Sequence, residues 1–240
     1  MKAPPVRAAL VAFALLLSPS APAEIVLCPE GMAFIDERTC IDRYEAALVL
    51  VGDAGAEEVL FPHNQEVKGQ PVRALSRASV FPQGHISRDE AEAACEASGK
   101  RLCRAAEWTK ACEGTTPTLY PYGPRYRSGH CDDEGVSSLN LLYGSAPARD
   151  YRIMNDPRLG TMAGTVARAG DFARCDSGYG VFDLVGNLHE WTAEPEGVFR
   201  GGYFLDTRVL GEGCRYATSG HAPTYRDYAT GFRCCADPAR

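Results

Sequence analysis

The chain begins with an apolar stretch, and beyond it short apolar pieces alternate with polar, turn-rich segments. A short basic start precedes an apolar run over 8–17, and small residues around Pro22 follow it. This order is typical of a secretory signal peptide with cleavage after Ala23. A membrane anchor is the alternative, but the run is far shorter than the roughly 20 residues that span a bilayer. We therefore expect a signal peptide over 1–23.

Two helices are predicted in the middle of the chain. The Ser87 hydroxyl can accept a hydrogen bond from the amide of Glu90, whose carboxylate can reach back, and Gly99 supplies a stop. A second helix is expected from about Ala105 to Cys112, with Trp108 as a core anchor. The first helix carries small residues at helical spacing on one face, which suits close packing: Ala91, Ala94, Cys95 and Ser98.

The remaining apolar pieces are short and are separated by turn residues. Strand-like pieces occur at 47–51, 59–61, 180–184 and 198–204. Beyond Gly114 the chain is rich in glycine, proline, aspartate and serine, and no repeated strand–helix unit is present. The pattern predicts irregular loops around short helices and strands, in a single domain over 24–240.

The charge of the chain excludes two classes of partner. The net charge is −6 at pH 7, and no run of basic residues occurs. Nucleic acids and anionic membrane surfaces are therefore poor partners. We expect a secreted or periplasmic protein that does not span a membrane.

The chain has ten cysteines, and these indicate how the loops are held together. An even number in an exported chain indicates a disulfide framework, because thiols are not kept reduced outside the cytoplasm. A zinc site is the alternative, but no pair shows Cys-x2-Cys spacing and the five histidines are scattered. We expect a fold that is stapled by disulfides.

A set of sequence blocks in a fixed order identifies a likeness to a known family. The blocks are GKRLCRAAEW (99–108), YPYG (120–123), GVFDLVGNLHEW (180–191), FRGGYF (199–204) and GFRCC (231–235). Together they resemble the sulfatase-modifying factor family, the formylglycine-generating enzymes. The resemblance covers about Met32 to Cys235 and implies the family's loop-dominated α+β fold, which is related to C-type lectins.

The resemblance implies two of the disulfides. It pairs Cys95 of the first helix with Cys234, and Cys112 at the end of the second helix with Cys214. Both bridges would tie a helix to the C-terminal segment.

The other six cysteines have no such guide, and six cysteines allow 15 connectivities. Cys28 and Cys40 close a short loop. Cys103 and Cys235 both depart from the family pattern, which favours their pairing with each other. Elimination then leaves Cys131 with Cys175, and these last assignments stay open at this point.

The resemblance does not extend to the cysteines that the family uses for catalysis. In the family, two cysteines between the RGG and GFR blocks hold copper(I), a soft ion that prefers thiolates. Here no cysteine occurs from Tyr203 to Gly213. Cys214 matches a structural cysteine, and Asp206, near the first missing thiol, is a hard oxygen ligand. We expect no copper and no copper-dependent oxidation of a sulfatase cysteine.

The VGNLHEW segment carries the candidate metal ligands. Asn187, Leu188 and Glu190 offer oxygen donors on a tight loop, and the family binds structural calcium there. The alternative is that Asn187 caps a turn and Glu190 bonds internally. Asp132 and Asp133 could serve a second ion, or form an acidic surface loop.

Candidate ligand-binding residues lie in the C-terminal loops. Arg200, Tyr203, Arg208 and Arg215 fall in or near the segment that forms the family's substrate groove, and arginine and aromatic side chains suit a peptide or carbohydrate. The sequence favours a non-catalytic binding protein. The alternative is a formylglycine-generating or other oxygen-dependent oxidase of the same family.

Overall fold

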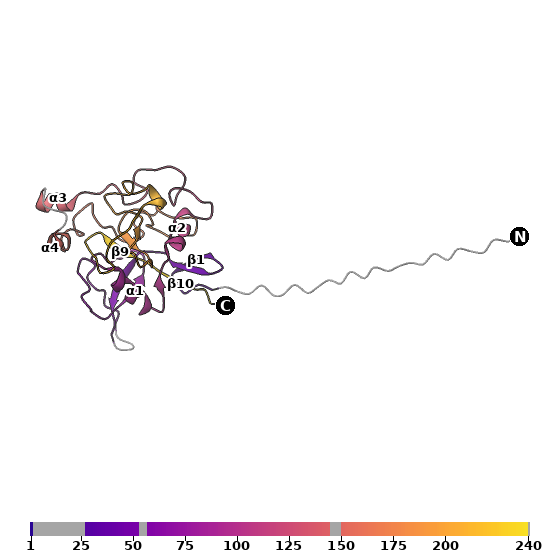
Figure 1. The fold of residues 1–240 in the computed structure, drawn as a ribbon, viewed down its shortest axis with the longest axis horizontal. Coiled ribbons are helices and arrows are strands. Elements are labelled where there is room, and N and C mark those ends of the chain that lie inside the picture. Colours follow the sequence, from indigo (N-terminus) through magenta and orange to yellow (C-terminus); the bar gives the residue numbers. More distant parts are fainter. Residues whose placement is uncertain (2–26, 53–56, 145–149, 240) are drawn as a thin grey trace.

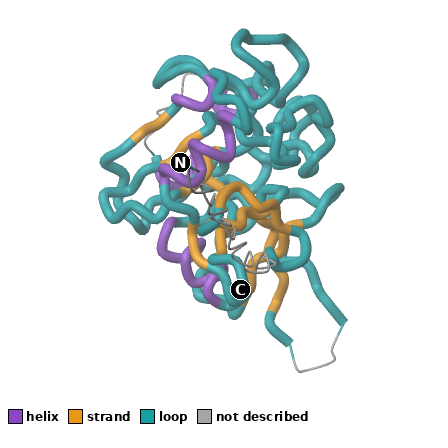
Figure 2. Tube along the Cα trace, turned by 90° about the vertical axis from the view of Figure 1, so that its right-hand side faces the viewer, coloured by secondary structure: helices purple, strands orange, loops and turns teal. Residues whose placement is uncertain are grey.

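The computed structural model describes Met1 and residues 27–52, 57–144 and 150–239 (Figure 1). Apart from Met1, the expected signal peptide over 1–23 lies outside these residues. No helix among the described residues is long and apolar enough to cross a membrane. The predicted α+β class is confirmed, because short strands and helices are joined by extensive loops (Figure 2).

One four-stranded sheet brings the two ends of the described chain together. Its strands are β1 (Met32–Asp36), β2 (Thr39–Asp42), β10 (Cys234–Ala236) and β5 (Arg101–Leu102), in that order. β10 pairs antiparallel with both β2 and β5. The C-terminal strand is therefore held between N-terminal and central segments.

A separate hairpin is formed by β3 (Ala46–Leu50) and β4 (Val72–Ser76). The strand predicted at 47–51 is thus found with a shift of one residue. The piece at 59–61 contributes only an isolated bridge between Leu60 and Val49.

A second four-stranded sheet lies at the centre of the site described below. Its strands are β8 (Ala217–Thr218), β7 (Phe199–Arg200), β6 (His189–Trp191) and β9 (Thr230–Phe232), in that order. β6 and β9 run parallel, and the other pairs are antiparallel. The strand predicted at 198–204 is cut short after Arg200, and 180–184 forms turns with a single bridge instead of a strand.

Both predicted helices are present, as α1 (Arg88–Glu96) and α2 (Ala105–Glu113). The Ser87–Glu90 capping box forms as expected. Short helices α3 (Ser138–Tyr143) and α4 (Tyr151–Met154) lie together at one side of the molecule in Figure 1, and a 3-10 turn, η1, spans Gly213–Arg215.

Five disulfides connect these pieces. They are the pairs arrived at from the sequence: Cys28–Cys40, Cys95–Cys234, Cys103–Cys235, Cys112–Cys214 and Cys131–Cys175. Two of them join α1 and α2 to C-terminal segments, and a third joins the residue after β5 to β10. Such a framework is typical of proteins that fold in an oxidising compartment.

Candidate functional site

The RGG block turns the chain sharply at the end of β7. Gly201 and Gly202 have φ values of 84° and 74°. A Cβ atom at Gly202 would lie 2.3 Å from the carbonyl oxygen of Asp206. Only glycine therefore allows the loop over 203–213 to fold back against the strand end.

Aromatic rings fill the space beside His189 on one face of this sheet. Three rings lie 4.6, 4.9 and 5.6 Å from the His189 ring, centroid to centroid: those of Phe199, Tyr203 and Tyr216. Burial lowers the pKa of His189 to about 3, so the imidazole is neutral at physiological pH. Tyr216 is buried and Tyr203 is partly buried. The place where a substrate groove was expected is packed with side chains.

Asp206, near the position of the first missing thiol, is used inside its own loop. Its Oδ1 accepts hydrogen bonds from the backbone N–H groups of Arg208 and Val209 at 2.9 and 3.0 Å. The Tyr216 hydroxyl donates to its Oδ2 at 3.2 Å. All ten cysteines of the chain are in disulfides. The residues present do not fit copper(I), because no thiolate is left to bind it.

Glu190, a candidate calcium ligand, is engaged by two buried donors. Arg233 donates to its carboxylate through Nε and Nη2 at 2.6 and 2.7 Å, and the indole N–H of Trp108 donates at 2.8 Å. Burial disfavours the charged form of Arg233, but the Glu190 carboxylate outweighs it and raises the pKa of Arg233. Glu190 therefore belongs to a matched ion pair in the core.

The other two candidate calcium ligands, Asn187 and Leu188, also make hydrogen bonds within the protein. The side-chain oxygen of Asn187 accepts from the backbone N–H of Ala167 at 2.9 Å, and its amide nitrogen donates to Glu45. The backbone N–H of Leu188 donates to Glu45 at 3.1 Å. The side-chain oxygens of Asn187 and Glu190 thus accept hydrogen bonds inside the protein, as in the alternative of a turn with internal hydrogen bonds, and a calcium ion there would have to compete with these donors.

The core around Arg233 holds more carboxylates than one arginine can neutralise. Burial raises the pKa of Asp183 to about 7, and burial together with repulsion from Glu190 raises that of Glu45. Asp132 also has its pKa raised to about 7, first by burial and then by repulsion from Asp183. In the fold these groups therefore keep their protons to a higher pH than an exposed carboxyl group does.

The acidic surface loop considered for Asp132 and Asp133 is contradicted. Asp132 is 8% exposed and Asp133 is 4% exposed. Thr207 donates to Asp133 at 3.0 Å, whereas Asp132 Oδ2 has no hydrogen-bond partner among the described residues. The sequence could not show this burial, because the chain segments that cover the two residues are remote from them.

The four expected ligand-binding side chains do not gather in one place. Tyr203 packs in the aromatic group, while Arg208 and Arg215 are exposed. The guanidinium of Arg208 lies 4.3 Å from the ring centroid of Tyr126, an aromatic residue that the sequence reasoning did not single out. No motif marks Tyr126, because its role depends on the approach of a loop remote in sequence.

Arg200 faces the opposite side of the sheet from the aromatic group. The register places Arg200 across from Glu190, whereas Phe199 lies across from Trp191. Neighbouring residues of a strand point to opposite faces. The sheet therefore has an aromatic face and a charged face, and Arg200 belongs to the charged one.

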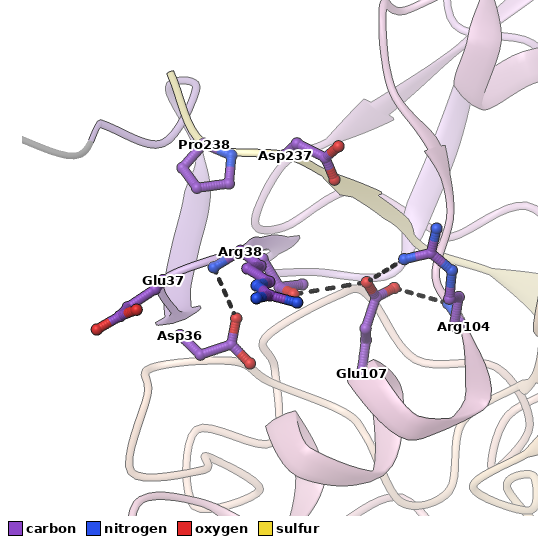
Figure 3. A pocket seen from close by; sticks show the side chains of 8 residues that line it. Asp36, Glu37, Arg38, Arg104, Glu107, Asp237 and Pro238 are labelled. Atoms are coloured by element: carbon purple, nitrogen blue, oxygen red, sulfur yellow. Dashed lines mark hydrogen bonds and ion pairs between the residues drawn. The ribbon is translucent and has the colours of Figure 1, made fainter. Parts of the chain in front are cut away.

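Two hollows lie near α2. One, of about 580 Å³, is formed by the β1–β2 turn and the start of α2, and Figure 3 shows Glu107 there facing Arg104. Glu107 forms ion pairs with both Arg101 and Arg104, so the charge of its carboxylate is neutralised. The other hollow, of about 680 Å³, is lined by Arg200 and Glu194.

Comparison with known proteins gives a consistent result. The sequence model of the family described as "Sulfatase-modifying factor enzyme 1-like domain" matches residues 40–238. "Inactive C-alpha-formylglycine-generating enzyme 2" of Bos taurus is 27% identical over 187 residues, which cover 71% of this chain and 55% of that protein. "Formylglycine-generating enzyme" of Mycobacterium tuberculosis is 30% identical over 189 residues, covering 65% of this chain and 58% of that protein. The chain thus spans about half the length of the curated relatives it matches.

Solved structures are similar at low identity. PvdO from Pseudomonas aeruginosa has a TM-score of 0.49 and 15% identity, covering 83% of this chain and 80% of its own. The U1 variant of Major Tropism Determinant has the same score and identity, covering 89% of this chain and 54% of its own.

Proposed function

Because this chain belongs to the sulfatase-modifying factor family, we propose that it is a non-catalytic member that binds a peptide or carbohydrate through its C-terminal loops. One observation carries the first half of the proposal. All ten cysteines form disulfides, and the loop over 203–213 offers Asp206 where a copper thiolate would be needed. The curated Bos taurus relative is itself named inactive, which is consistent with this proposal.

The surface that supports binding is the tip of this same loop. Val209 is 80% exposed and Leu210 is 50% exposed, next to Arg208 on the face of Tyr126. Arg215 is exposed on η1, a few residues further along. Exposed apolar side chains beside arginine and tyrosine are typical of recognition surfaces, because they combine contact area with directed hydrogen bonds.

The proposed location follows from two features. Disulfides persist in oxidising compartments, and the first 23 residues have the pattern of a secretory signal. We propose that the protein is secreted or periplasmic. N-terminal sequencing of the exported protein checks this, and Glu24 is the expected first residue of the mature chain.

The decisive experiment uses the purified, oxidised mature protein. It is incubated with Cu(I), oxygen and a cysteine-containing sulfatase peptide, and formylglycine is sought by mass spectrometry while oxygen uptake is followed. We expect neither product nor oxygen consumption. Formylglycine formation, or oxygen uptake with a stoichiometric redox metal, would show an oxidase and would overturn the proposal.

Binding is tested on the same preparation with immobilised peptides and oligosaccharides. We expect saturable association that Arg208→Ala weakens by about tenfold or more, because a charge-assisted contact is removed. Arg38→Ala, an exposed arginine at the β1–β2 turn, is the matched control and should bind as the unchanged protein does. Equal effects of the two substitutions would argue against the loop tip as the binding surface.

A further inference from the structure

The hollow beside α2 lies on the charged face of the β6–β7 sheet and is separate from the loop tip. Its walls include Ala105, Ala106 and Pro117, which are apolar, together with Arg200 and Glu194. Its volume of about 680 Å³ is in the range of small-molecule sites. The hollow therefore has room for a ligand group and both charged and apolar surface to hold it.

Arg200 carries a charge that no described residue neutralises. Its side chain is half-buried, it forms no hydrogen bond or ion pair with any residue in the described ranges, and its Nε is buried without a partner. Burial lowers the pKa of Arg200, whereas attraction from Glu194 acts in the opposite direction. A half-buried arginine without an acceptor is unfavourable by itself, because its lost hydration is not replaced.

Two carboxylates lie near Arg200, and neither pairs with it in the structure. Glu190, directly across the sheet, is bound to Arg233 and Trp108. Glu194 accepts from the backbone N–H of Ala105 at 2.8 Å through Oε1, its buried Oε2 has no hydrogen-bond partner among the described residues, and it makes no ion pair with Arg200. The guanidinium therefore has no acceptor among the described residues, and a ligand group that enters the hollow can supply one.

The surroundings of Arg200 favour a particular kind of anion. Glu194 and Glu113 also line the hollow, and Lys110 at its edge is paired with Asp36. A strongly charged dianion would be repelled by the two carboxylates. A planar monoanion matches the planar guanidinium, since two parallel N–H groups can donate to two oxygens.

We propose that this hollow binds a carboxylate group attached to a small apolar moiety, with Arg200 as the residue that holds the carboxylate. The apolar wall contacts the carbon part of the ligand. Two sources share this chemistry: a free small carboxylic acid, and the C-terminal end of a peptide. The proposal is independent of the binding function assigned to the loop tip.

The test is isothermal titration calorimetry with the oxidised mature protein. The probes are N-acetylalanine, N-acetyl-alanyl-alanine, the C-terminal amide of that dipeptide, and sulfate. We expect saturable binding of the carboxylates and none of the amide. A dipeptide that binds about tenfold more tightly than N-acetylalanine would identify a peptide end, and equal affinities would identify a free acid.

Substitution of Arg200 tests whether this residue holds the carboxylate. Arg200→Met should weaken carboxylate binding by about 10- to 100-fold, because hydrogen bonds to a charged group are lost. Arg38→Met, at the exposed β1–β2 turn, should leave it unchanged. Amide binding equal to that of the acid, a preference for sulfate, or undiminished binding by Arg200→Met would overturn the proposal.

A measurement without ligand guards against a trivial loss of folding. Arg200→Met should unfold at the same temperature as the unchanged protein or at a higher one, because it removes an unmatched, half-buried charge. Arg200→Lys should fold and bind with intermediate affinity, since it keeps the charge but loses the paired donors. A clear fall in Tm for both variants would show that Arg200 has a structural partner, and this would also overturn the proposal.

Discussion

Two arginines lie on either side of Glu190, and the fold treats their charges in opposite ways. Arg233 is completely buried and donates to both oxygens of Glu190 and to backbone carbonyls, including that of Phe182 at 2.8 Å. Arg200 is half-buried and has no acceptor among the described residues. Arg233 therefore stabilises the fold, whereas Arg200 is available to bind a ligand.

The same contrast separates the two faces of the β6–β7 sheet. On the aromatic face, rings close the space around His189, and the Asp206 carboxylate is bound by its own loop. On the charged face, a hollow remains open beside Arg200. The place where the family's copper site was expected is therefore filled by side chains in this chain. On the other face of the sheet, the hollow beside Arg200 is open and contains an unpaired charge.

The largest effect is expected from breaking the matched pair. Glu190→Gln removes the one carboxylate that Arg233 contacts directly, and removal of one partner of a buried pair typically costs about 3–5 kcal/mol. Urea unfolding of the oxidised protein measures the change. Glu194→Gln is the control, with an expected loss below about 1 kcal/mol, because Glu194 makes one hydrogen bond to a backbone N–H. A similar loss in both variants would remove the distinction between matched and unmatched charges.

The second effect concerns the excess of carboxylates near Arg233. Asp183 and Asp132, each with a pKa raised to about 7, hold protons in the fold that the unfolded chain has released. A group with a raised pKa in the fold stabilises at low pH and loses this contribution as pH rises. We expect the free energy of unfolding to fall between about pH 4 and pH 7, because over this range the fold binds more protons than the unfolded chain does.

Asp183→Asn tests the origin of this dependence. Its side-chain oxygen can still accept from the backbone N–H of Gly170, as Asp183 does at 2.7 Å, but it does not titrate. Urea unfolding at pH 5 and pH 7.5 should therefore show a smaller difference for the variant than for the unchanged protein. A stability that rises over this interval would contradict the assignment.

Local signals account for what the sequence predicted well. The Ser87–Glu90 capping box lies within one turn of chain, and it forms as expected at the start of α1. The absence of the two copper-binding cysteines could also be predicted from the sequence, because it depends on residue identity alone. The cysteine pairs also agree with the expectation, although elimination alone led to Cys131–Cys175.

Non-local competition accounts for what the sequence did not predict. The apolar piece at 180–184 is largely buried, yet no neighbouring strand completes a ladder with it, so it forms turns. Arg200 was expected beside Tyr203, but strand alternation places it on the other face. Arg200 has no ion pair with Glu190 because Arg233, 43 residues from Glu190 in the sequence, already binds that carboxylate.

The smallest effect is expected from calcium, and it tests whether the turn at 187–190 is complete without an ion. The side-chain oxygens of Asn187 and Glu190 already accept hydrogen bonds from Ala167, Arg233 and Trp108. A calcium ion would have to displace these donors, and its ligation would leave the Arg233 charge unmatched. Thermal unfolding at pH 7 should therefore give the same Tm in EDTA and in millimolar calcium.

Arg233→Met is the informative variant, because it frees the Glu190 carboxylate. A Tm that rises with calcium only in this variant would show that the arginine occupies the place of a cation, whereas a rise in the unchanged protein would show that the loop binds calcium despite its hydrogen bonds.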